Sequence, residues 1–477
     1  MKIVRNYLYN ASYQVLLILL PLITGPYVSR ILGPTGVGIN SYTYSIANWY
    51  VLLGSIGVGL YGNRQIAYVR SNEKDLALNF WEIFFMKATV VIIFFAFYIV
   101  YVVKFGKYKK FELAQSVYLV AALFDISWFF MGVEDFKRTV TRNTIVKIIS
   151  LILILIFVKS KSDLLLYIYI LSFATFGGNL TLWPYLNRYI HKIEISKLHP
   201  WRHFKGSIEL FLPLAAIQIY TTLNKVMLGY FDSATSTGFY DKSDSIVRMS
   251  LTIVTSLGTV LLPHISKMIA EGETKRVNQL LYKSFSFTSF LSIPIMFGLA
   301  AISIKFAPFF YGDGFETVGY ALFIESFVII FIAWASVTGN QFLIPAGLVK
   351  PYTFSIIIGA IANLLLNIPL IKLWGLFGAI VATLVSEVSV TTYQIYSIRK
   401  FVSYKKLFHD TGKYITAGII MFTLVFLLNI KLKMDFVTLL VEIIIGVLVY
   451  LIMSLLLRPD IISKIMLFIK ENFGVKK

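Results

Sequence analysis

Long apolar stretches recur along the whole chain and leave little room between them for any other structure. A helix that crosses a bilayer needs about 20 mostly apolar residues, and fourteen stretches of this kind can be placed, of which the fifth is the shortest. They are residues 8–31, 40–62, 80–103, 113–133, 143–158, 164–187, 207–230, 245–266, 284–304, 318–340, 353–371, 375–398, 414–430 and 437–457. Because the intervening loops are short, the sequence predicts an all-α membrane protein with about fourteen transmembrane helices.

The composition agrees with a membrane protein. Hydrophobic residues make up 57% of the chain and charged residues only 14%, whereas soluble domains carry about 25% charged residues. The absence of cysteine excludes disulfides, thiolate metal sites and a cysteine nucleophile. We attribute the net charge of +20 to cytoplasmic loops beside anionic lipid, so no nucleic-acid partner is expected.

The distribution of positive charge predicts the orientation. Most of the 44 lysines and arginines fall in alternate loops, which are the cytoplasmic ones if the N-terminus is inside. Arg142 and Lys147 are assigned to such a loop and to the start of the short fifth helix. The lysine-rich loop 104–110 is the one exception and is predicted to be external. Both termini are therefore predicted to be cytoplasmic, and Arg30 is predicted to lie at the external end of the first helix.

The two halves of the chain resemble each other. The stretch GINSYTYSI (38–46) aligns with GFYDKSDSI (238–246) at an offset of 200 residues, and each opens the second helix of its half. An even number of helices between the copies predicts a parallel repeat. We expect two pseudo-symmetric six-helix bundles around a central cavity, an N-lobe (1–200) and a C-lobe (201–405), followed by two more helices and a cytoplasmic tail (406–477). Chance similarity between Gly/Ser-rich stretches is the alternative.

Three stretches carry a family resemblance. The stretch SRILGPTGVGINSYTYSIANW (29–49), followed by LGSIGVGLYGNRQIA (53–67), resembles the N-terminal signature of oligosaccharide flippases of the Wzx type, which act on O-antigen and capsule repeat units. The stretch NLLLNIPLIKLWGLFGAIVATLVSE (363–387) resembles their eleventh and twelfth helices. These flippases belong to the multidrug/oligosaccharidyl-lipid/polysaccharide exporter superfamily.

The resemblance implies both a cargo and a location. The cargo would be an undecaprenyl-diphosphate-linked oligosaccharide, carried across the bacterial cytoplasmic membrane by alternating access between two lobes. Membrane lipids, a polysaccharide polymerase and chain-length machinery are the partners that it implies. No cofactor is expected, and coupling to H⁺, Na⁺ or the membrane potential is left open.

A diphosphate crossing the bilayer needs cations in a wet cavity, because a charge at the bilayer centre costs at least ~2.5–3.5 kcal/mol. Arginine suits this role, since its planar fork bonds phosphate oxygens bidentately. The candidates are Arg30, Lys225 with its neighbour Asn224, and Arg248. The first and seventh helices correspond in the repeat, so Arg30 and Lys225 are expected to face each other across the cavity mouth. The alternatives are snorkelling for Arg30, and either snorkelling or pairing with Asp244 for Arg248.

Other polar residues in the spans are candidates for sugar binding or ion coupling. Asn40 and Tyr42 belong to a polar aromatic run whose rings could stack on sugars, although aromatic residues also crowd any membrane interface. Asp125 and Glu325 lie in the middle of predicted spans, where an ionisable residue either carries a proton or pairs with a cation. By resemblance to the sodium site of the lipid II flippases, Asn363, Asn367 and Thr383 could hold an ion. The missing carboxylate at Asn367 favours an interhelical hydrogen bond instead.

Three functions fit a protein of this class: a flippase, a drug or ion antiporter of the same superfamily, and a membrane-embedded polysaccharide enzyme. An enzyme should carry a carboxylate or histidine constellation on an external loop, and these loops are short. An antiporter for cationic drugs should have an acidic cavity, whereas the candidates here are mostly basic. The sequence therefore favours a flippase, not an enzyme, with an anionic cargo.

Overall fold

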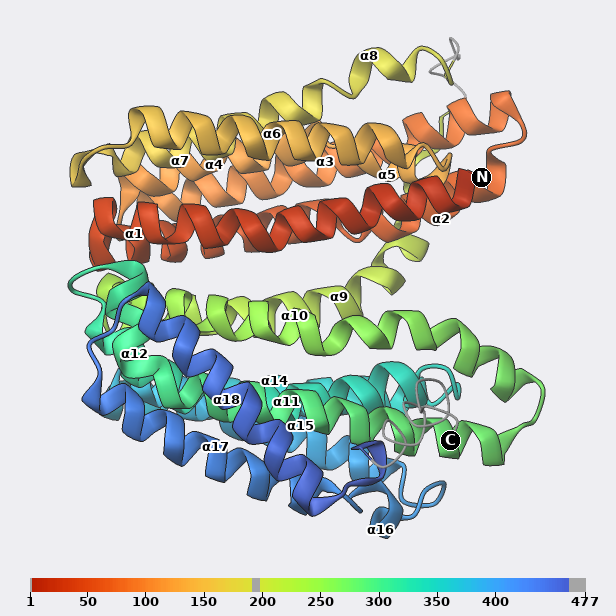
Figure 1. Cartoon of the computed structure of the whole chain (residues 1–477). Coiled ribbons are helices and arrows are strands. Elements are labelled where there is room, and N and C mark those ends of the chain that lie inside the picture. Colours follow the sequence, from red (N-terminus) through yellow and green to blue (C-terminus); the bar gives the residue numbers. More distant parts are fainter. Residues whose placement is uncertain (1, 191–197, 463–477) are drawn as a thin grey trace. The chain divides into compact units, whose positions relative to one another are not determined.

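The chain forms an all-helical structure (Figure 1). The computed structural model describes residues 2–190 and 198–462, with side chains described outside 2–18, 212–214, 216, 217, 219, 220, 256–264, 266, 267 and 270. Contacts divide the chain into two units, Met1–Gly238 and Phe239–Lys477. The predicted lobes 1–200, 201–405 and 406–477 stay predictions, because they are defined by the internal repeat, whereas the two units are defined by which residues contact each other.

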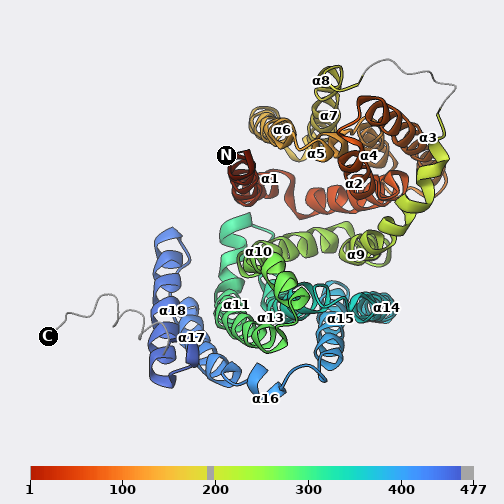
Figure 2. The same cartoon turned by 90° about the vertical axis from the view of Figure 1, so that its right-hand side faces the viewer.

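The helices of the first unit lie side by side along much of their length (Figures 1 and 2), with α1 in contact with α3, α4 and α6, and α4 in contact with α7. The elements are α1 (Lys2–Ser55), α2 (Val58–Val69), α3 (Glu73–Phe105), α4 (Lys109–Leu123), α5 (Ser127–Gly132), α6 (Phe136–Phe157), η1 (Lys161–Asp163), α7 (Leu164–Leu180), α8 (Trp183–Leu186), η3 (Pro200–His203) and α9 (Phe204–Phe231). Helix α10 (Ala234–Ala270) begins in this unit and continues into the second.

The second unit also contains a helical break, between α12 and α13. Its elements are α11 (Thr274–Tyr311), α12 (Glu316–Glu325), α13 (Val328–Ala335), the π-helical segment η4 (Ser336–Leu343), α14 (Val349–Trp374), α15 (Leu376–Ser397), α16 (Tyr404–Leu407), α17 (Thr411–Lys431) and α18 (Phe436–Leu457). Helix α14 packs against α15, and α17 packs against both α11 and α18.

Nine helical stretches within the described residues are long and apolar enough to cross a membrane. They are Glu73–Phe105, Lys109–Gly132, Phe136–Phe157, Lys161–Leu186, Thr274–Tyr311, Val349–Trp374, Leu376–Ser397, Tyr404–Lys431 and Phe436–Leu457. The pair α12 and α13, bent by 43°, makes a tenth if it is counted as one span. Each of the fourteen predicted ranges is mostly helical in the structure, although some are interrupted by short breaks, so the multi-pass helical architecture is confirmed, with nine or ten spans shown.

The predicted break between the first two spans is present, but it is shorter than the predicted loop. Helix α1 consists of two helical segments that meet at a kink, where only Gly33 leaves helical geometry, with φ 68°. Glycine has no Cβ and adopts positive φ at little steric cost. Pro34 follows, and a proline is tolerated at the first position of the helical segment that resumes there. One glycine therefore makes the turn that the sequence pattern assigned to a whole loop.

The two segments aligned at an offset of 200 residues meet inside the first unit. The Thr35 and Thr235 hydroxyl oxygens lie 2.9 Å apart. A Cβ on Gly38 would lie 1.6 Å from the carbonyl oxygen of Ala234, and one on Gly238 would lie 2.3 Å from that of Pro34. Self-pairing of equivalent residues is what a two-fold axis between repeats produces. We call residues 34–38 together with 234–238 the crossing contact.

Candidate functional site

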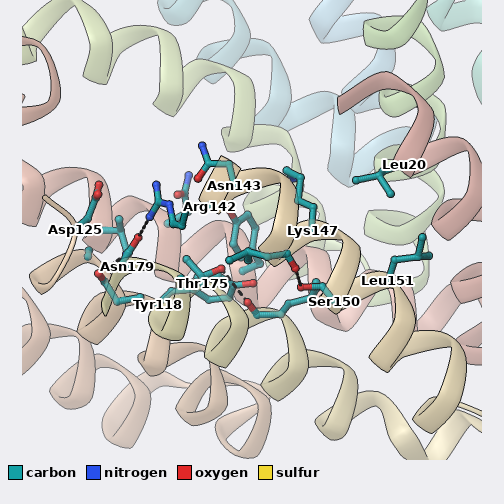
Figure 3. A pocket seen from close by; sticks show the side chains of 18 of the residues that line it. Leu20, Tyr118, Asp125, Arg142, Asn143, Lys147, Ser150, Leu151, Thr175 and Asn179 are labelled. Atoms are coloured by element: carbon teal, nitrogen blue, oxygen red, sulfur yellow. Dashed lines mark hydrogen bonds between the residues drawn. The ribbon is translucent and has the colours of Figure 1, made fainter. Parts of the chain in front are cut away.

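The first unit contains a polar cavity of about 540 Å³ (Figure 3). Both segments of α1 line it, together with α4, α6 and α7. Its volume lies within the range of ~300–1,000 Å³ that is typical of small-molecule sites. The residues that line it belong to one unit, so the cavity does not depend on how the two units are placed.

A break in the fourth predicted span forms one end of the cavity. The sequence predicts Asp125 in the middle of a helix. In the structure α4 ends at Leu123 and α5 begins at Ser127, so Asp125 lies between two helices. The carboxylate of Asp125 lines the cavity and accepts a hydrogen bond of 2.9 Å from the backbone N–H of Ser127. Broken helices of this kind line binding sites in many membrane transporters.

Side chains satisfy the carbonyl groups that this break exposes. Lys87 Nζ donates to the Asp125 carbonyl at 2.8 Å, Trp183 Nε1 donates to that of Phe124 at 2.9 Å, and Asn179 Nδ2 donates to that of Ala121 at 2.6 Å. Non-helical backbone at membrane depth is tolerated only where such partners exist. Hydrogen bonds from side chains of α3, α7 and α8 therefore stabilise the break.

Two cationic side chains of α6, Arg142 and Lys147, line the same cavity. The Arg142 guanidinium donates to the amide oxygen of Asn179, as Figure 3 shows, and Asp125 is close enough to interact with it electrostatically. This chain of contacts orients the guanidinium at the helix break. Two cations in a polar cavity suit an anionic ligand.

Hydroxyl and aromatic groups line the rest of the cavity. Tyr44 and Tyr118 meet edge to face with ring centroids 5.2 Å apart, and Thr175 and Ser150 add hydroxyl groups. Aromatic faces stack on sugar rings, and hydroxyls exchange hydrogen bonds with sugar hydroxyls. The lining therefore combines cationic, aromatic and hydroxyl groups, which suit an anionic ligand rich in hydroxyl groups.

Arg142 and Lys147 are absent from the sequence-predicted site because positive charge beside a span end is typical of a cytoplasmic loop, whereas both lie within α6, which begins at Phe136. A pattern in the sequence does mark them. Arg142, Asn143, Lys147 and Ser150 recur at helical spacing on one face, and the opposite face carries isoleucines with 40–55% exposure. These are Ile145, Ile148, Ile149, Ile152 and Ile156. Positive charge is typical of cytoplasmic loops, and this expectation conceals the polar face of α6.

None of the predicted cations lines the cavity. Arg30 on α1 is exposed, and Lys225 on α9 is half-buried and close enough to Tyr44 for an electrostatic interaction. The pairing alternative for Arg248 is confirmed, since its Nε donates to the Asp244 carboxylate at 2.8 Å. That Arg30 and Lys225 face each other stays a prediction.

Most of the residues predicted to contact sugar are buried or contact other parts of the protein. Asn40 Oδ1 accepts from Gln115 Nε2 at 3.3 Å, and Asn224 is only 3% exposed. Tyr42 is 2% exposed, and its ring packs so closely on Gly229 that a Cβ there would lie 2.0 Å from it. The Tyr42 ring is therefore inaccessible to a sugar in this structure.

The predicted coupling residues of the second unit are buried. The Ser243 hydroxyl donates to Glu325, which ends α12 and is 1% exposed. Asn367 Nδ2 donates to Asn363 Oδ1 at 2.8 Å within α14. This bond joins residues one helical turn apart, and the predicted interhelical hydrogen bond stays a prediction. Thr383 Oγ1 donates to the Ala379 carbonyl of its own helix at 2.9 Å.

One group within the described residues has metal-ligand chemistry: His409, Asp410 and Asp460 in the second unit. The Lys413 ammonium, however, lies 2.8 Å from Asp410 Oδ1, where a metal ion would have to bind. An ammonium in that position repels a second cation, so we assign no metal to this group.

Comparison with known proteins agrees with the resemblance noted in the sequence. A "Putative O-antigen transporter" of Escherichia coli (strain K12) is 26% identical over 83% of this chain and 96% of its own length. The structure is similar to a lipid II flippase MurJ in an inward closed conformation, with a TM-score of 0.73 at 18% identity, covering 96% of this chain and 100% of that one.

A second solved structure, an inward-facing multidrug resistance MATE family transporter, matches with a TM-score of 0.62 at 12% identity over 80% of this chain and 94% of its own. These relatives are transporters and flippases, in line with the prediction that the chain is not an enzyme. The family model described as "Polysaccharide biosynthesis protein" matches residues 3–269. Since this match covers more than half of the 477 residues, the chain belongs to the polysaccharide biosynthesis protein family.

Proposed function

We propose that the protein is a flippase that carries undecaprenyl-diphosphate-linked oligosaccharide repeat units across the bacterial cytoplasmic membrane. Supporting this are the family, a relative described as an O-antigen transporter that aligns over most of both chains, and the flippase-like fold. In this proposal all fourteen helical ranges cross the membrane and both termini are cytoplasmic. Two lobes open alternately to the two sides, and no covalent bond is made or broken.

The observation that carries the proposal is the cation-lined cavity of the first unit. A diphosphate buried in a bilayer needs opposite charge and hydrogen-bond donors, and Arg142 and Lys147 supply both. Bidentate donation by a guanidinium to phosphate oxygens is both strong and directional. The neighbouring Tyr44 and Tyr118 then serve the first sugar.

We assign the sequence-predicted residues to later stages of transport. Arg30 and Lys225, with Asn224, would hold the diphosphate near the outer leaflet, and Arg248 would contribute once released from Asp244. Asn40 and Tyr42 would contact sugar only after the closed packing around them opens.

Coupling remains part of the proposal. Asp125 and Glu325 are candidates to carry protons, and Asn363, Asn367 and Thr383 are candidates to bind an ion. H⁺, Na⁺ and the membrane potential are each compatible with these residues. A polysaccharide polymerase and chain-length machinery would use the exported repeat unit.

A gene deletion tests the function directly. In the deletion strain, undecaprenyl-diphosphate-linked repeat units should accumulate on the cytoplasmic face, and surface polysaccharide should be lost. The wild-type chain should restore the polysaccharide, whereas Arg142→Ala at normal membrane abundance should not. Full restoration by Arg142→Ala would rule out the cavity as the diphosphate site.

Orientation has its own test, since the chain contains no cysteine. Lys110 is exposed at the start of α4, and Lys110→Cys should react with membrane-impermeant maleimide in intact cells. Lys275, exposed at the start of α11, lies in a loop predicted to be cytoplasmic, so Lys275→Cys should react only after lysis. The reverse pattern would invert the proposed topology.

A drug antiporter is the second candidate, because of the similarity in fold to a MATE family transporter. A cavity for cationic drugs should carry net negative charge, whereas Arg142 and Lys147 outnumber Asp125 here. Drug resistance unchanged by the deletion would exclude this candidate.

A further inference from the structure

A buried carboxylate lies apart from the cavity, in the first turn of α4. Glu112 is fully buried, and neither of its oxygens has a hydrogen-bond partner of normal geometry within the part of the chain that the structure describes. The backbone amides of Lys107 and Tyr108 lie near it but do not reach that geometry. An ionised carboxylate in such a place is costly, and a protonated one is much less so.

Tyrosines surround this carboxylate on three elements. Tyr42 comes from α1, Tyr98 and Tyr101 from α3, and Tyr108 from the residue before α4. The Tyr98 hydroxyl donates to the backbone carbonyl of Glu112 at 2.6 Å, so it serves the backbone and not the carboxylate. Among the side chains that the structure describes, the one cation close enough to the carboxylate to interact with it is Lys109, which is exposed.

The same group of side chains touches the end of α9. The Tyr42 ring packs on Gly229 and meets the Tyr108 ring edge to face at 5.9 Å. Lys107 Nζ donates to the Gly229 carbonyl at 2.8 Å. Gly229 lies five residues before Ala234, where the crossing contact begins. A change in the packing around Glu112 would therefore act on the segment that forms the crossing contact.

We infer that Glu112 is a proton-binding residue of the transport cycle, protonated while the crossing contact is closed and deprotonated when that contact opens. On opening, water reaches the carboxyl group and accepts its proton, which leaves a hydrated carboxylate. On closing, a proton returns from the same side, the one where the lysine-rich loop is predicted to be external. This inference rests on the proposed function in one respect: opening of the crossing contact is taken to belong to the transport cycle.

The second unit offers a matched control residue. Glu316 also lies in the first turn of its helix, α12. It is exposed, and its carboxylate accepts a hydrogen bond of 3.2 Å from the Gly314 N–H. An exposed and hydrogen-bonded acid can stay ionised in every state of the cycle. Glu316→Gln therefore removes a carboxylate from a comparable helix position without removing a buried proton site.

The absence of native cysteine makes the crossing contact measurable without any glycan. Full-length Thr35→Cys/Thr235→Cys protein is reconstituted in phosphatidylethanolamine–phosphatidylglycerol vesicles, and disulfide formation is followed over a range of external pH. Each rate is divided by that of the same cysteine pair carrying Glu112→Gln, which cancels the intrinsic pH dependence of thiol chemistry. The ratio should be near one in acid and fall with rising pH, by up to about tenfold per pH unit, the limit for one ionising group.

Two further variants distinguish a carboxylate that binds and releases a proton from one that only stabilises the fold. Glu112→Asp should keep the pH dependence because it keeps an ionisable group, and Glu316→Gln should keep it unchanged. A ratio that stays constant over the whole pH range overturns the inference, as does an equal loss of pH dependence in Glu316→Gln. Neither result affects the proposed function, which the deletion strain tests separately.

The unsubstituted chain supplies a second measurement in case Glu112→Gln does not fold. Dicyclohexylcarbodiimide modifies protonated carboxyl groups in apolar surroundings. Mass spectrometry of the labelled wild-type protein should find the adduct on Glu112 in acid, with a yield that falls as the pH rises. Absence of the adduct at every pH would overturn the inference, as would a yield that does not depend on pH.

Discussion

Asp125 follows the end of α4 and Glu325 ends α12, but the two helical breaks have different surroundings. Asp125 and Glu325 are 200 residues apart, as are Thr35 and Thr235. At the first break the carboxylate lines a cavity with Arg142, and side chains from other elements hold the free carbonyls. At the second break Glu325 is 1% exposed, and the span bends by 43°.

This difference shows that the two breaks share an acid but not its surroundings. A helix break beside an acidic residue occurs in both units. The cations beside the first break have no counterpart at the second, since the position 200 residues after Lys87 is Phe287 and the position 200 residues after Arg142 is Phe342. The break in the first unit therefore differs from the other in lying beside a cavity lined by Arg142 and Lys147.

The largest effect on stability should come from Lys87→Met. Lys87 is 3% exposed, and its ammonium bonds the Asp125 carbonyl. Its removal leaves a buried carbonyl without its donor and removes a positive charge close to the Asp125 carboxylate. Loss of one partner of a buried charged pair costs about 3–5 kcal/mol.

This loss should appear as a lower unfolding temperature of the purified protein in detergent. The equivalent position in the second unit already carries a hydrophobic side chain, so Phe287→Met is the control and should be close to neutral. Equal unfolding temperatures for Lys87→Met and the wild type would show that the first break does not depend on its lysine.

A smaller loss is expected from Trp183→Phe. The substitution keeps most of the aromatic packing against Phe84 and Phe124 but removes the Nε1 donor to the Phe124 carbonyl. One buried hydrogen bond is worth about 1 kcal/mol, so thermal unfolding should shift less than in Lys87→Met. A larger shift than in Lys87→Met would mean that aromatic packing, and not carbonyl satisfaction, holds the break.

The smallest effect should come from Asn367→Ala in the second unit. Asn367 donates to Asn363 one turn before it on the same helix, and no carboxylate stands at this position. Transport should weaken modestly, and replacing sodium by potassium should have little effect on the wild type. A steep sodium dependence that disappears in Asn367→Ala would instead establish an ion site there.

The sequence predicts the spans well and the breaks poorly, and both results have a physical reason. Hydropathy depends on local composition, so every predicted range is mostly helical. The break at Asp125 depends on Lys87, Asn179 and Trp183, which lie 38 to 59 residues from the carbonyls they bond. No local sequence pattern indicates such contacts. A polar residue in an apolar stretch gives the same pattern whether the helix is broken there or continuous.

For the candidate site too, local sequence patterns predict some residues, and contacts between distant residues determine the others. The acids Asp125 and Glu325 were recognised because charges in apolar spans are rare. Arg142 and Lys147 were assigned to a loop because positive charge near a span end is common, although their helical spacing distinguishes them. Glu112 lies four residues into a lysine-rich helix start, and its burial arises only when α1 and α3 pack over it.

The central claim is that the cavity of the first unit binds the diphosphate, and a binding measurement tests it most directly. Undecaprenyl diphosphate is titrated onto the purified full-length chain in nanodiscs, with Arg142→Ala, Arg142→Lys and Arg70→Ala compared with the wild type. Arg70 is an arginine outside the cavity, paired with Glu134 on the surface.

A hydrogen bond to a charged group contributes about 1.5–3 kcal/mol, so Kd for Arg142→Ala should rise by about 10- to 100-fold. Arg142→Lys should lie between Arg142→Ala and the wild type, because the charge remains and the fork is lost, and Arg70→Ala should bind like the wild type. A folded Arg142→Ala protein with the Kd of the wild type would contradict the account.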